Sequence, residues 1–319
     1  MNEFEIINKY FKKLTKNNPA SFNLSDDIFY DKSKKLAVSI DTYNENVHYL
    51  NTNSPSLLIK KIIRSSISDL ICKGIKPSHI FLSGSGDAKL FNKNKLNNIS
   101  KSIKEELLKY NLKLSGGDTT YAKNSSFSVT SIGFGNKIIP RNKAKYNDDI
   151  YVTNNIGDAF IGLNILKKKF YINKKTNKYF INKYYLPDLP IKFIKNISKY
   201  ANTSIDISDG IFSDLEKMII DQKFGFIINI NKIPISKNLK NLISKKKLNL
   251  ENIISNGDDF QTLFTSSLKN RGKILSIAKR INLKITRIGF INKNPNKKVI
   301  LKGQKVLKLL NNKGYYHKF

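Results

Sequence analysis

Apolar and polar residues follow two recurring patterns along the chain. Apolar residues at helical spacing predict amphipathic helices, and these stretches are residues 5–16, 56–71, 92–110 and 211–220. Alternating or short apolar runs predict strands, expected at residues 36–40, 80–83, 112–115, 127–134, 150–153, 204–208, 226–230 and 260–264. Helices and strands are interleaved in both halves, so the pattern predicts an α/β (α+β) fold.

The chain is long enough for two domains. Its 319 residues could form two units that each bury a core. A turn-rich segment at residues 140–149 separates the two series of elements. We therefore predict domains at residues 1–139 and 140–319. No repeat of fixed period is present, which excludes solenoid architectures.

Composition indicates a globular protein of a reducing compartment. Hydrophobic residues make up 40% and aromatic residues 11% of the chain, enough apolar surface to favour folding. Cys72 is the single cysteine, which excludes an intrachain disulfide and a cysteine-based zinc or iron–sulfur site. No apolar run reaches the length of a membrane span, and the N-terminus does not resemble a signal peptide. We expect a cytoplasmic protein.

The charge is strongly positive. Lys and Arg number 57 against 24 acidic residues, which gives +33, and such a charge is typical of proteins that bind nucleic acid or another polyanion. The lysines are instead spread along the whole chain in short runs, which favours a generic solvated surface. A polyanion-binding patch remains the alternative. We do not expect nucleic acid as a partner, although the positive field would attract anionic nucleotides.

Acidic residues are scarce and are mostly aspartate. Of the 24 acidic residues, 17 are Asp and 7 are Glu. Many aspartates lie beside Ser, Thr or Gly, mostly at the ends of predicted strands: Asp26, Asp27, Asp41, Asp69, Asp118, Asp206, Asp209, Asp258 and Asp259. Each alone could be a turn, a helix cap or a surface residue. Together, converging carboxylates would repel one another unless cations neutralised them, and Mg²⁺ suits oxygen ligands that also hold phosphates.

A glycine-rich turn adds a second hint of phosphate binding. In Gly116-Gly117-Asp118-Thr119 the glycines lack a Cβ, so backbone N–H groups could approach a phosphate closely. The chain has no Walker lysine loop and none of the protein-kinase signature motifs. The two commonest ATP-binding designs are therefore absent.

The motifs, taken in order, resemble those of the thiamine-monophosphate kinase family. The resemblance covers essentially the whole chain and is carried by Ser25-Asp26-Asp27, Ser39-Ile40-Asp41-Thr42, Val47-His48-Tyr49, Ile67-Ser68-Asp69-Leu70, Gly116-Gly117-Asp118-Thr119-Thr120, Tyr151-Val152-Thr153 with Gly157-Asp158, Ile205-Asp206-Ile207-Ser208-Asp209-Gly210, Gly257-Asp258-Asp259 and Gly314-Tyr315-Tyr316-His317. It implies a two-domain, synthetase-like ATP-binding fold. The N-terminal half would form a β-barrel across a homodimer, and the C-terminal half would be an α/β domain.

The resemblance also implies an activity and a site. The activity is the direct transfer of the γ-phosphate of ATP, the co-substrate, to thiamine monophosphate, with several Mg²⁺ ions as cofactors. We assign no general base, because a phosphate nucleophile is already ionised near pH 7. Catalysis would act through Mg²⁺ held by Asp41 and Asp118. The implied magnesium ligands are Asp27, Ser39, Asp41, Asp69, Asp118 and Asp206, with Asp209 on a further ion and Ile40 through its backbone alone. ATP would contact Gly117, Asp118, Arg141 and Ser208, and the thiamine substrate would contact His48, Asp258 and Tyr315.

The chain departs from the family pattern at several positions. Asn23-Leu24-Ser25 replaces a loop with two glycines, Ile40 replaces a threonine, and the segment Asp258-Asp259-Phe260-Gln261 shortens a substrate-binding acid. By position alone, His48 and Tyr315 could equally be packing residues. Related synthetases remain rivals, but selenophosphate synthetase and the hydrogenase-maturation dehydratase need a terminal cysteine that this chain lacks. A polyanion-binding protein that has lost the chemistry is the other alternative.

Overall fold

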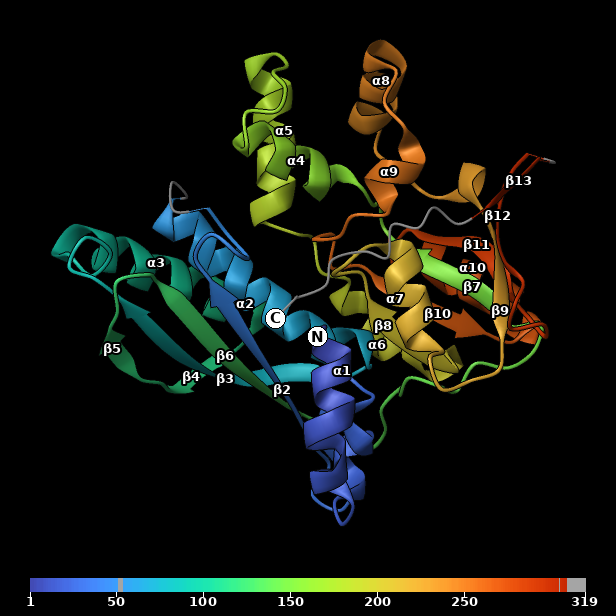
Figure 1. The fold of residues 1–319 in the computed structure, drawn as a ribbon, viewed down its shortest axis with the longest axis horizontal. Coiled ribbons are helices and arrows are strands. Elements are labelled where there is room, and N and C mark those ends of the chain that lie inside the picture. Colours follow the sequence, from blue (N-terminus) through green and yellow to red (C-terminus); the bar gives the residue numbers. More distant parts are fainter. Residues whose placement is uncertain (51–53, 304, 309–319) are drawn as a thin grey trace.

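The structure is a computed structural model that describes residues 1–50, 54–303 and 305–308, and it contains two β-sheets (Figure 1). The first sheet has six strands in the order β1-β2-β6-β3-β4, with β5 paired to the end of β3. Its strands are β1 (Phe29–Asp31), β2 (Leu36–Asn44), β3 (Lys76–Gly86), β4 (Lys113–Gly116), β5 (Thr119–Tyr121) and β6 (Ser126–Phe134). The long central strands β2, β6 and β3 pair antiparallel.

Two long helices cover one face of the first sheet (Figure 1). They are α2 (Pro55–Cys72) and α3 (Lys93–Tyr110). Apolar residues of α2 pack with inward residues of the strands, such as Ile80 and Val129, in one buried cluster. The opposite face carries exposed apolar side chains, among them Ile40 and Phe81, so alternation along the strands gives a buried and an open face.

The second sheet has seven strands among the described residues, in the order β13-β12-β9-β11-β7-β10-β8. Apart from the parallel pair β12–β9, neighbouring strands are antiparallel. The strands are β7 (Asp149–Thr153), β8 (Thr203–Asp206), β9 (Gly225–Asn229), β10 (Thr262–Ser266), β11 (Ile285–Asn292), β12 (Lys298–Lys302) and β13 (Lys305–Lys308).

Helices cover both faces of the second sheet. Helix α7 (Ile211–Met218) packs on one face, and α6 (Ile191–Asn196) and α10 (Arg271–Arg280) pack on the other. The remaining helices, which project beyond the sheets in Figure 1, are α4 (Asp158–Leu166), α5 (Lys174–Tyr185), α8 (Lys237–Lys246) and α9 (Leu250–Ile254). The prediction of a mixed α/β fold is confirmed.

Helix α2 connects the two sheets. Its Ser68 hydroxyl donates a 2.7 Å hydrogen bond to Asp206 at the end of β8. One turn earlier, Arg64 forms a buried ion pair with Glu106 of α3 and donates to the carbonyl oxygen of Pro187. The helix therefore carries polar contacts to both halves of the chain on its buried surface.

Two local predictions are wrong. The helix expected at residues 5–16 is divided into α1 (Glu3–Ile6), a π-helical turn (Ile7–Phe11) and a 3₁₀ turn (Lys12–Thr15). Its predicted apolar face is largely exposed, with Leu14 79% accessible, so no packing holds a continuous α-helix there. Asp41 was expected at a strand end but lies inside β2, because β2 pairs with β6 as far as Asn44.

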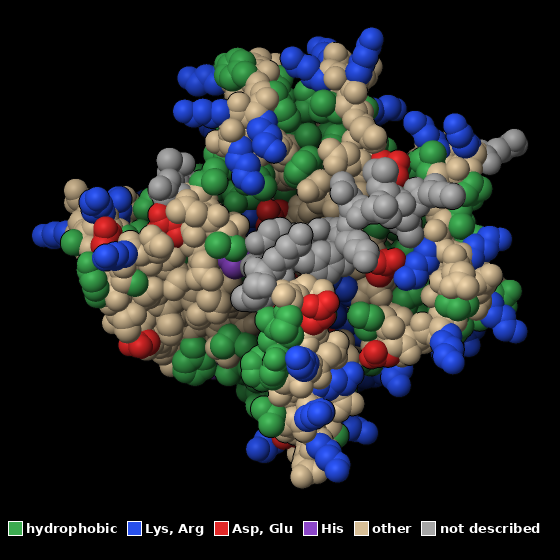
Figure 2. Space-filling model, in the orientation of Figure 1, with side chains coloured by type: hydrophobic (Ala, Val, Ile, Leu, Met, Phe, Trp, Pro, Cys, Tyr) green, Lys and Arg blue, Asp and Glu red, His purple; other side chains and the backbone are tan. Residues whose placement is uncertain are grey.

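Basic side chains are distributed over the visible surface in Figure 2. They project from the helices, from both ends of the view and from the second sheet, and are not gathered on one element. This distribution agrees with the predicted solvated surface. In the part of the chain that is described, no helix is long and apolar enough to cross a membrane.

Candidate active site

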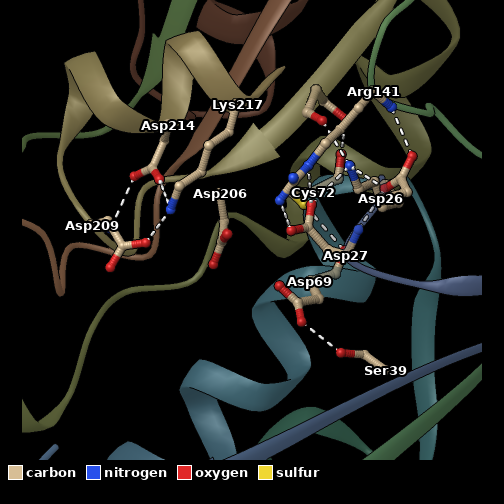
Figure 3. Close-up of polar contacts among 12 residues, drawn as sticks. Asp26, Asp27, Ser39, Asp69, Cys72, Arg141, Asp206, Asp209, Asp214 and Lys217 are labelled. Carbon is tan, nitrogen blue, oxygen red and sulfur yellow. Dashed lines mark hydrogen bonds and ion pairs between the residues drawn. The ribbon is translucent and has the colours of Figure 1, made fainter. Parts of the chain in front are cut away.

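Three aspartates from different elements form the centre of the candidate site. Asp41 comes from β2, Asp69 from α2 and Asp206 from the end of β8. The Ser39 hydroxyl donates a 2.5 Å hydrogen bond to Asp69, and Ser68 donates to Asp206. In Figure 3, Asp69 and Asp206 face a common space. The site thus lies where α2 meets β2 on one side and β8 on the other.

Burial and mutual repulsion disfavour negative charge at this centre. Burial raises the pKa of Asp41. Burial, then the neighbouring Asp41 and Asp206 charges, raise the pKa of Asp69 well above its usual range. Burial, with Asp214 and Asp41 nearby, raises the pKa of Asp206 to about 7. None of these three carboxylates forms an ion pair within the described residues. Serine hydrogen bonds and the charge of Lys73 offset only part of the raised pKa of Asp69 and Asp206, so a bound cation would relieve the remaining cost.

The β2 alternation and a run of serines in α2 build this centre. Ser39, Asp41 and Tyr43 share the face of β2 that is turned toward α2, because every second residue points the same way. The Ser65 hydroxyl donates a 2.6 Å hydrogen bond to the Tyr43 hydroxyl oxygen, which lies 3.4 Å from Asp41. Ile40 points to the open face and is 69% exposed, as expected if only its backbone faced the site.

A second acidic pair is already neutralised. The Asp26 and Asp27 carboxylates contact the ammonium group of Lys73 at 2.8 and 3.0 Å. Arg141, predicted as an ATP contact, pairs with Asp27 through its guanidinium group, and its backbone N–H donates to Asp26 (Figure 3). The forked donor of Arg141 is therefore engaged by a carboxylate in this structure.

Asp209 also has a basic partner. It follows β8 and pairs with Lys217 of α7. Asp214, in the first turn of α7, accepts hydrogen bonds of 3.0 Å from the backbone N–H groups of Asp209 and Gly210. Burial raises the pKa of Asp214 to about 6, although the charge of Lys217 opposes this shift. The carboxylate of Asp214 therefore shapes the turn that presents Asp209 and Ser208.

Glycines bring backbone segments together around the site. A Cβ at Gly117 would lie 1.9 Å from the carbonyl oxygen of Leu82 in β3, so this residue must be glycine to let the β4–β5 loop approach the sheet. Asp118 follows in that loop with an exposed side chain. A Cβ at Gly257 would lie 1.6 Å from the Ser208 carbonyl oxygen, which accepts a hydrogen bond from the Asp258 N–H.

The predicted substrate residues His48 and Asp258 are linked through two other side chains. Asp258 pairs with Lys61 of α2 at 2.7 Å, and the Lys61 ammonium group lies 3.4 Å from the centre of the Tyr184 ring. The Tyr184 hydroxyl donates to the His48 carbonyl oxygen at 3.4 Å. His48 Nδ1 accepts a hydrogen bond from the Asn44 N–H, so this residue also has a structural role. Tyr315 lies outside the described residues.

Comparison with known proteins places the chain in a family. The family model for AIR synthase related protein, N-terminal domain, matches residues 23–135. A thiamine-monophosphate kinase of Buchnera aphidicola subsp. Schizaphis graminum (strain Sg) is 35% identical over 99% of this chain and 98% of its own length. That of Buchnera aphidicola subsp. Acyrthosiphon pisum (strain APS) is 37% identical over 91% of this chain and 90% of its own. The chain belongs to the thiamine-monophosphate kinase family.

A solved structure of this family has the same fold. AaThiL, complexed with AMPPCP and TMP, superposes with a TM-score of 0.84 at 25% identity, over 99% of this chain and 97% of that chain. The superposition covers nearly the whole chain, so this chain shares the overall fold of AaThiL. The family assignment from motifs is confirmed.

Sequence analysis missed the basic side chains of this family member that pair with its acidic residues. Lys61, Lys73 and Lys217 each place an ammonium group beside an aspartate. In a chain with 57 basic residues, lysine itself carries no signal. The one usable cue was the position of Lys73 within the apolar stretch from Leu70 to Ile75, where a solvated lysine is not expected.

The family implies magnesium, and the central donors fit this cation in type. Carboxylate and hydroxyl oxygens of Asp41, Asp69, Asp206 and Ser39 are hard ligands that Mg²⁺ prefers. The three carboxylates form no ion pair among the described residues. Within residues 1–50, 54–303 and 305–308, no three Asp, Glu, His or Cys side chains are already arranged around one metal position. Asp27 and Asp209 fit less well, because Lys73, Arg141 and Lys217 occupy them.

Proposed function

We infer that the chain is a magnesium-dependent kinase that transfers the γ-phosphate of ATP to the phosphate of thiamine monophosphate, giving thiamine diphosphate and ADP. The relatives at 35% and 37% identity are thiamine-monophosphate kinases. AaThiL has been solved with AMPPCP and TMP. The observation that carries the inference is the convergence of Asp41, Asp69 and Asp206 without a cationic partner.

The chemistry needs charge neutralisation more than proton transfer. Both reacting groups are phosphates, so two anions must be held in line. Bound Mg²⁺ would supply the positive charge that lets them approach and would stabilise the charge on the transferred group. The chain contributes fixed oxygen ligands, which Ser39 and Ser68 orient by hydrogen bonds. No general base is required, because a phosphate acceptor is already ionised near neutral pH.

We propose the following roles for the site residues. Mg²⁺ is held first by Ser39, Asp41, Asp69 and Asp206, with Asp118, Asp209 and the backbone of Ile40 as further ligands. ATP is contacted by Gly117, Asp118, Arg141 and Ser208. The thiamine substrate is contacted by His48, Asp258 and Tyr315. The links from His48 through Tyr184 and Lys61 to Asp258 support a common substrate region.

We further propose a cytoplasmic homodimer in which the open faces of two first sheets form a β-barrel. Support comes from exposed apolar side chains on three strands of that face: Ile40, Phe81 and Phe134. Such a patch is uncommon on a monomer. Residues 1–139 would then form the dimerisation and ATP-binding domain, and residues 140–319 the second domain.

The proposed function is tested by following thiamine diphosphate during incubation of the purified protein with ATP, thiamine monophosphate and MgCl₂. We expect one ADP per thiamine diphosphate, and loss of both products with excess EDTA. Unphosphorylated thiamine serves as the control acceptor and is expected to give no product. A folded protein that binds ATP but makes no thiamine diphosphate contradicts the proposal.

A further inference from the structure

Lys73 is fully buried, and its ammonium group lies among the carboxylates of the candidate site. The side chain is 0% exposed, and the residue caps the C-terminal end of α2. Its Nζ lies 2.8 Å from Asp26 and 3.0 Å from Asp27, and donates a 2.8 Å hydrogen bond to the Ser204 carbonyl oxygen of β8. An ammonium group has three donors. All three are satisfied by protein oxygens, so this charge needs no water.

The charges at this position are balanced. Asp27 is contacted by Lys73 and by the guanidinium group of Arg141, and Asp26 accepts from Lys73 and from the Arg141 backbone N–H. Two carboxylates thus face two side-chain cations. The Asp41, Asp69 and Asp206 group has no such partner within the described residues. Asp26, Asp27 and Asp209 therefore each contact a side-chain cation, whereas Asp41, Asp69 and Asp206 do not, although the charge of Lys73 partly offsets the raised pKa of Asp69 and Asp206.

We propose that Lys73 takes the place of a metal ion at Asp26 and Asp27, so that bound Mg²⁺ is excluded from this pair and is held chiefly by Asp41, Asp69 and Asp206. The inference rests on the proposed function, because it concerns the magnesium of that reaction. Lys73 is then a positioning residue. It holds the Asp26-Asp27 segment against β8 and supplies a permanent positive charge at the site. Asp27 forms ion pairs with Lys73 and Arg141 and is not a magnesium ligand.

The surroundings favour a fixed ammonium group at this place. A buried charge is tolerated only when it is paired and hydrogen-bonded, and both conditions are met for Lys73. Its position at the end of α2 adds the favourable interaction of a cation with a helix C-terminus. Removal of the ammonium group alone would leave the Asp26 carboxylate, which is 2% exposed, without its cation. A divalent ion could then enter the vacated position.

The first test compares thermal unfolding of the wild type and the Lys73→Met variant without nucleotide, in EDTA and in increasing MgCl₂. In EDTA we expect the variant to unfold roughly 5–10 °C below the wild type, because a buried ion pair has lost one partner. MgCl₂ is expected to reduce this difference in unfolding temperature by at least half. Lys61→Met is the control, since Lys61 is similarly buried but forms an ion pair with one carboxylate among the described residues, that of Asp258. The difference between its unfolding temperature and that of the wild type is expected to stay constant. The proposal is overturned if Mg²⁺ does not change the difference in unfolding temperature between the wild type and Lys73→Met.

The second test uses the wild type and so does not depend on a variant that folds. Crystals of the wild type are soaked in MnCl₂, and the metal is located by its anomalous signal. We expect Mn²⁺ beside Asp41, Asp69 and Asp206, with Lys73 still in contact with Asp27. Mn²⁺ bound to Asp27 overturns the proposal. Neither test uses turnover, so failure of the proposed function, seen as absent thiamine diphosphate, is distinguished from failure of this inference.

Discussion

Leu24 has a left-handed backbone that non-glycine residues adopt at a cost. Its φ is 56°, and the neighbouring Phe22 and Asn23 have φ values of 52° and 53°. Left-handed geometry costs a residue with a Cβ roughly 1–2 kcal/mol, and Asn tolerates it better than Leu. The segment leads directly into Asp26, so the strained backbone lies next to the candidate site.

We expect Leu24→Asn to stabilise the protein by about 0.5–1 kcal/mol, because the left-handed strain is reduced and the lost Leu24 side chain is 41% exposed. Chemical denaturation of both proteins measures the free energy of unfolding. The matched control is Leu14→Asn, which makes the same exchange at an exposed position in a 3₁₀ turn and is expected to give no gain. Equal effects of the two exchanges would contradict the strain argument.

For single residues, the sequence indicates which side chains carry the chemistry, but not which side chains contact one another. The aspartates of the site could be chosen because acidic residues are scarce in this chain. The burial of Lys73 had a cue in the apolar stretch from Leu70 to Ile75, but the carboxylates that it contacts had none. A salt bridge between Lys73 and Asp26 joins residues 47 positions apart, and only the fold brings them together.

Two loops at the end of the second sheet are held together by glycines. Gly210, with φ of +115°, packs against the Ser255 carbonyl group, and Gly257 packs against that of Ser208. Backbone hydrogen bonds from Asp258 to Ser208 and from Phe260 to Ile207 join the same loops. The pairing sets the position of Asp258 relative to the end of β8.

We expect Gly257→Ala to cost about 2 kcal/mol or more and to weaken use of thiamine monophosphate, because the new Cβ would meet the Ser208 backbone at 1.6 Å. Thermal unfolding and the KM for thiamine monophosphate measure the two effects. Gly272→Ala is the control, since nothing lies within 4 Å of its Cβ position in α10, and it should be neutral or slightly stabilising. A Gly257→Ala protein with unchanged stability and KM would refute this role of the glycine.

Helices and strands were predicted correctly where one of their faces is buried. Helices such as α2 and strands such as β6 follow their periodicity because one face packs into a core. The segment at residues 5–16 has helical periodicity but exposes Tyr10 and Leu14, so periodicity alone gave the wrong length of regular helix. Asp41 was misplaced because the polar residues that follow it still pair with β6.

The open face of the first sheet is the proposed dimer interface. Ile40, Phe81 and Phe134 lie on adjacent strands of that face and are 69%, 38% and 55% exposed. We expect Phe81→Lys to convert the proposed dimer to a monomer, because a desolvated lysine at an apolar interface is costly. Light scattering after gel filtration measures the mass.

The control for this prediction is Leu108→Lys on α3. Leu108 is 74% exposed but lies on the helical layer that covers the opposite face, so the exchange is expected to leave the dimer intact. A monomeric wild type, or a Phe81→Lys protein that remains dimeric, would contradict the proposed barrel.

Long-range assembly limits what the sequence could predict of the site. Asp41, Asp69 and Asp206 were expected to converge, but the reason, that α2 packs between β2 and β8, follows from the packing of two sheets and has no local signature. The ordered motifs gave the family, which the 35% and 37% identical relatives confirm.

The most direct measurement is the rate of thiamine diphosphate formation from ATP and thiamine monophosphate at saturating MgCl₂, compared between the wild type, Asp69→Asn and Glu105→Gln. Asp69 lies at the centre of the proposed magnesium group, whereas Glu105 is an exposed carboxylate on α3. We expect the wild type and Glu105→Gln to be equally active, and Asp69→Asn to lose at least roughly a hundredfold in kcat. A folded wild type without activity, or an Asp69→Asn protein as active as the wild type, would contradict the account.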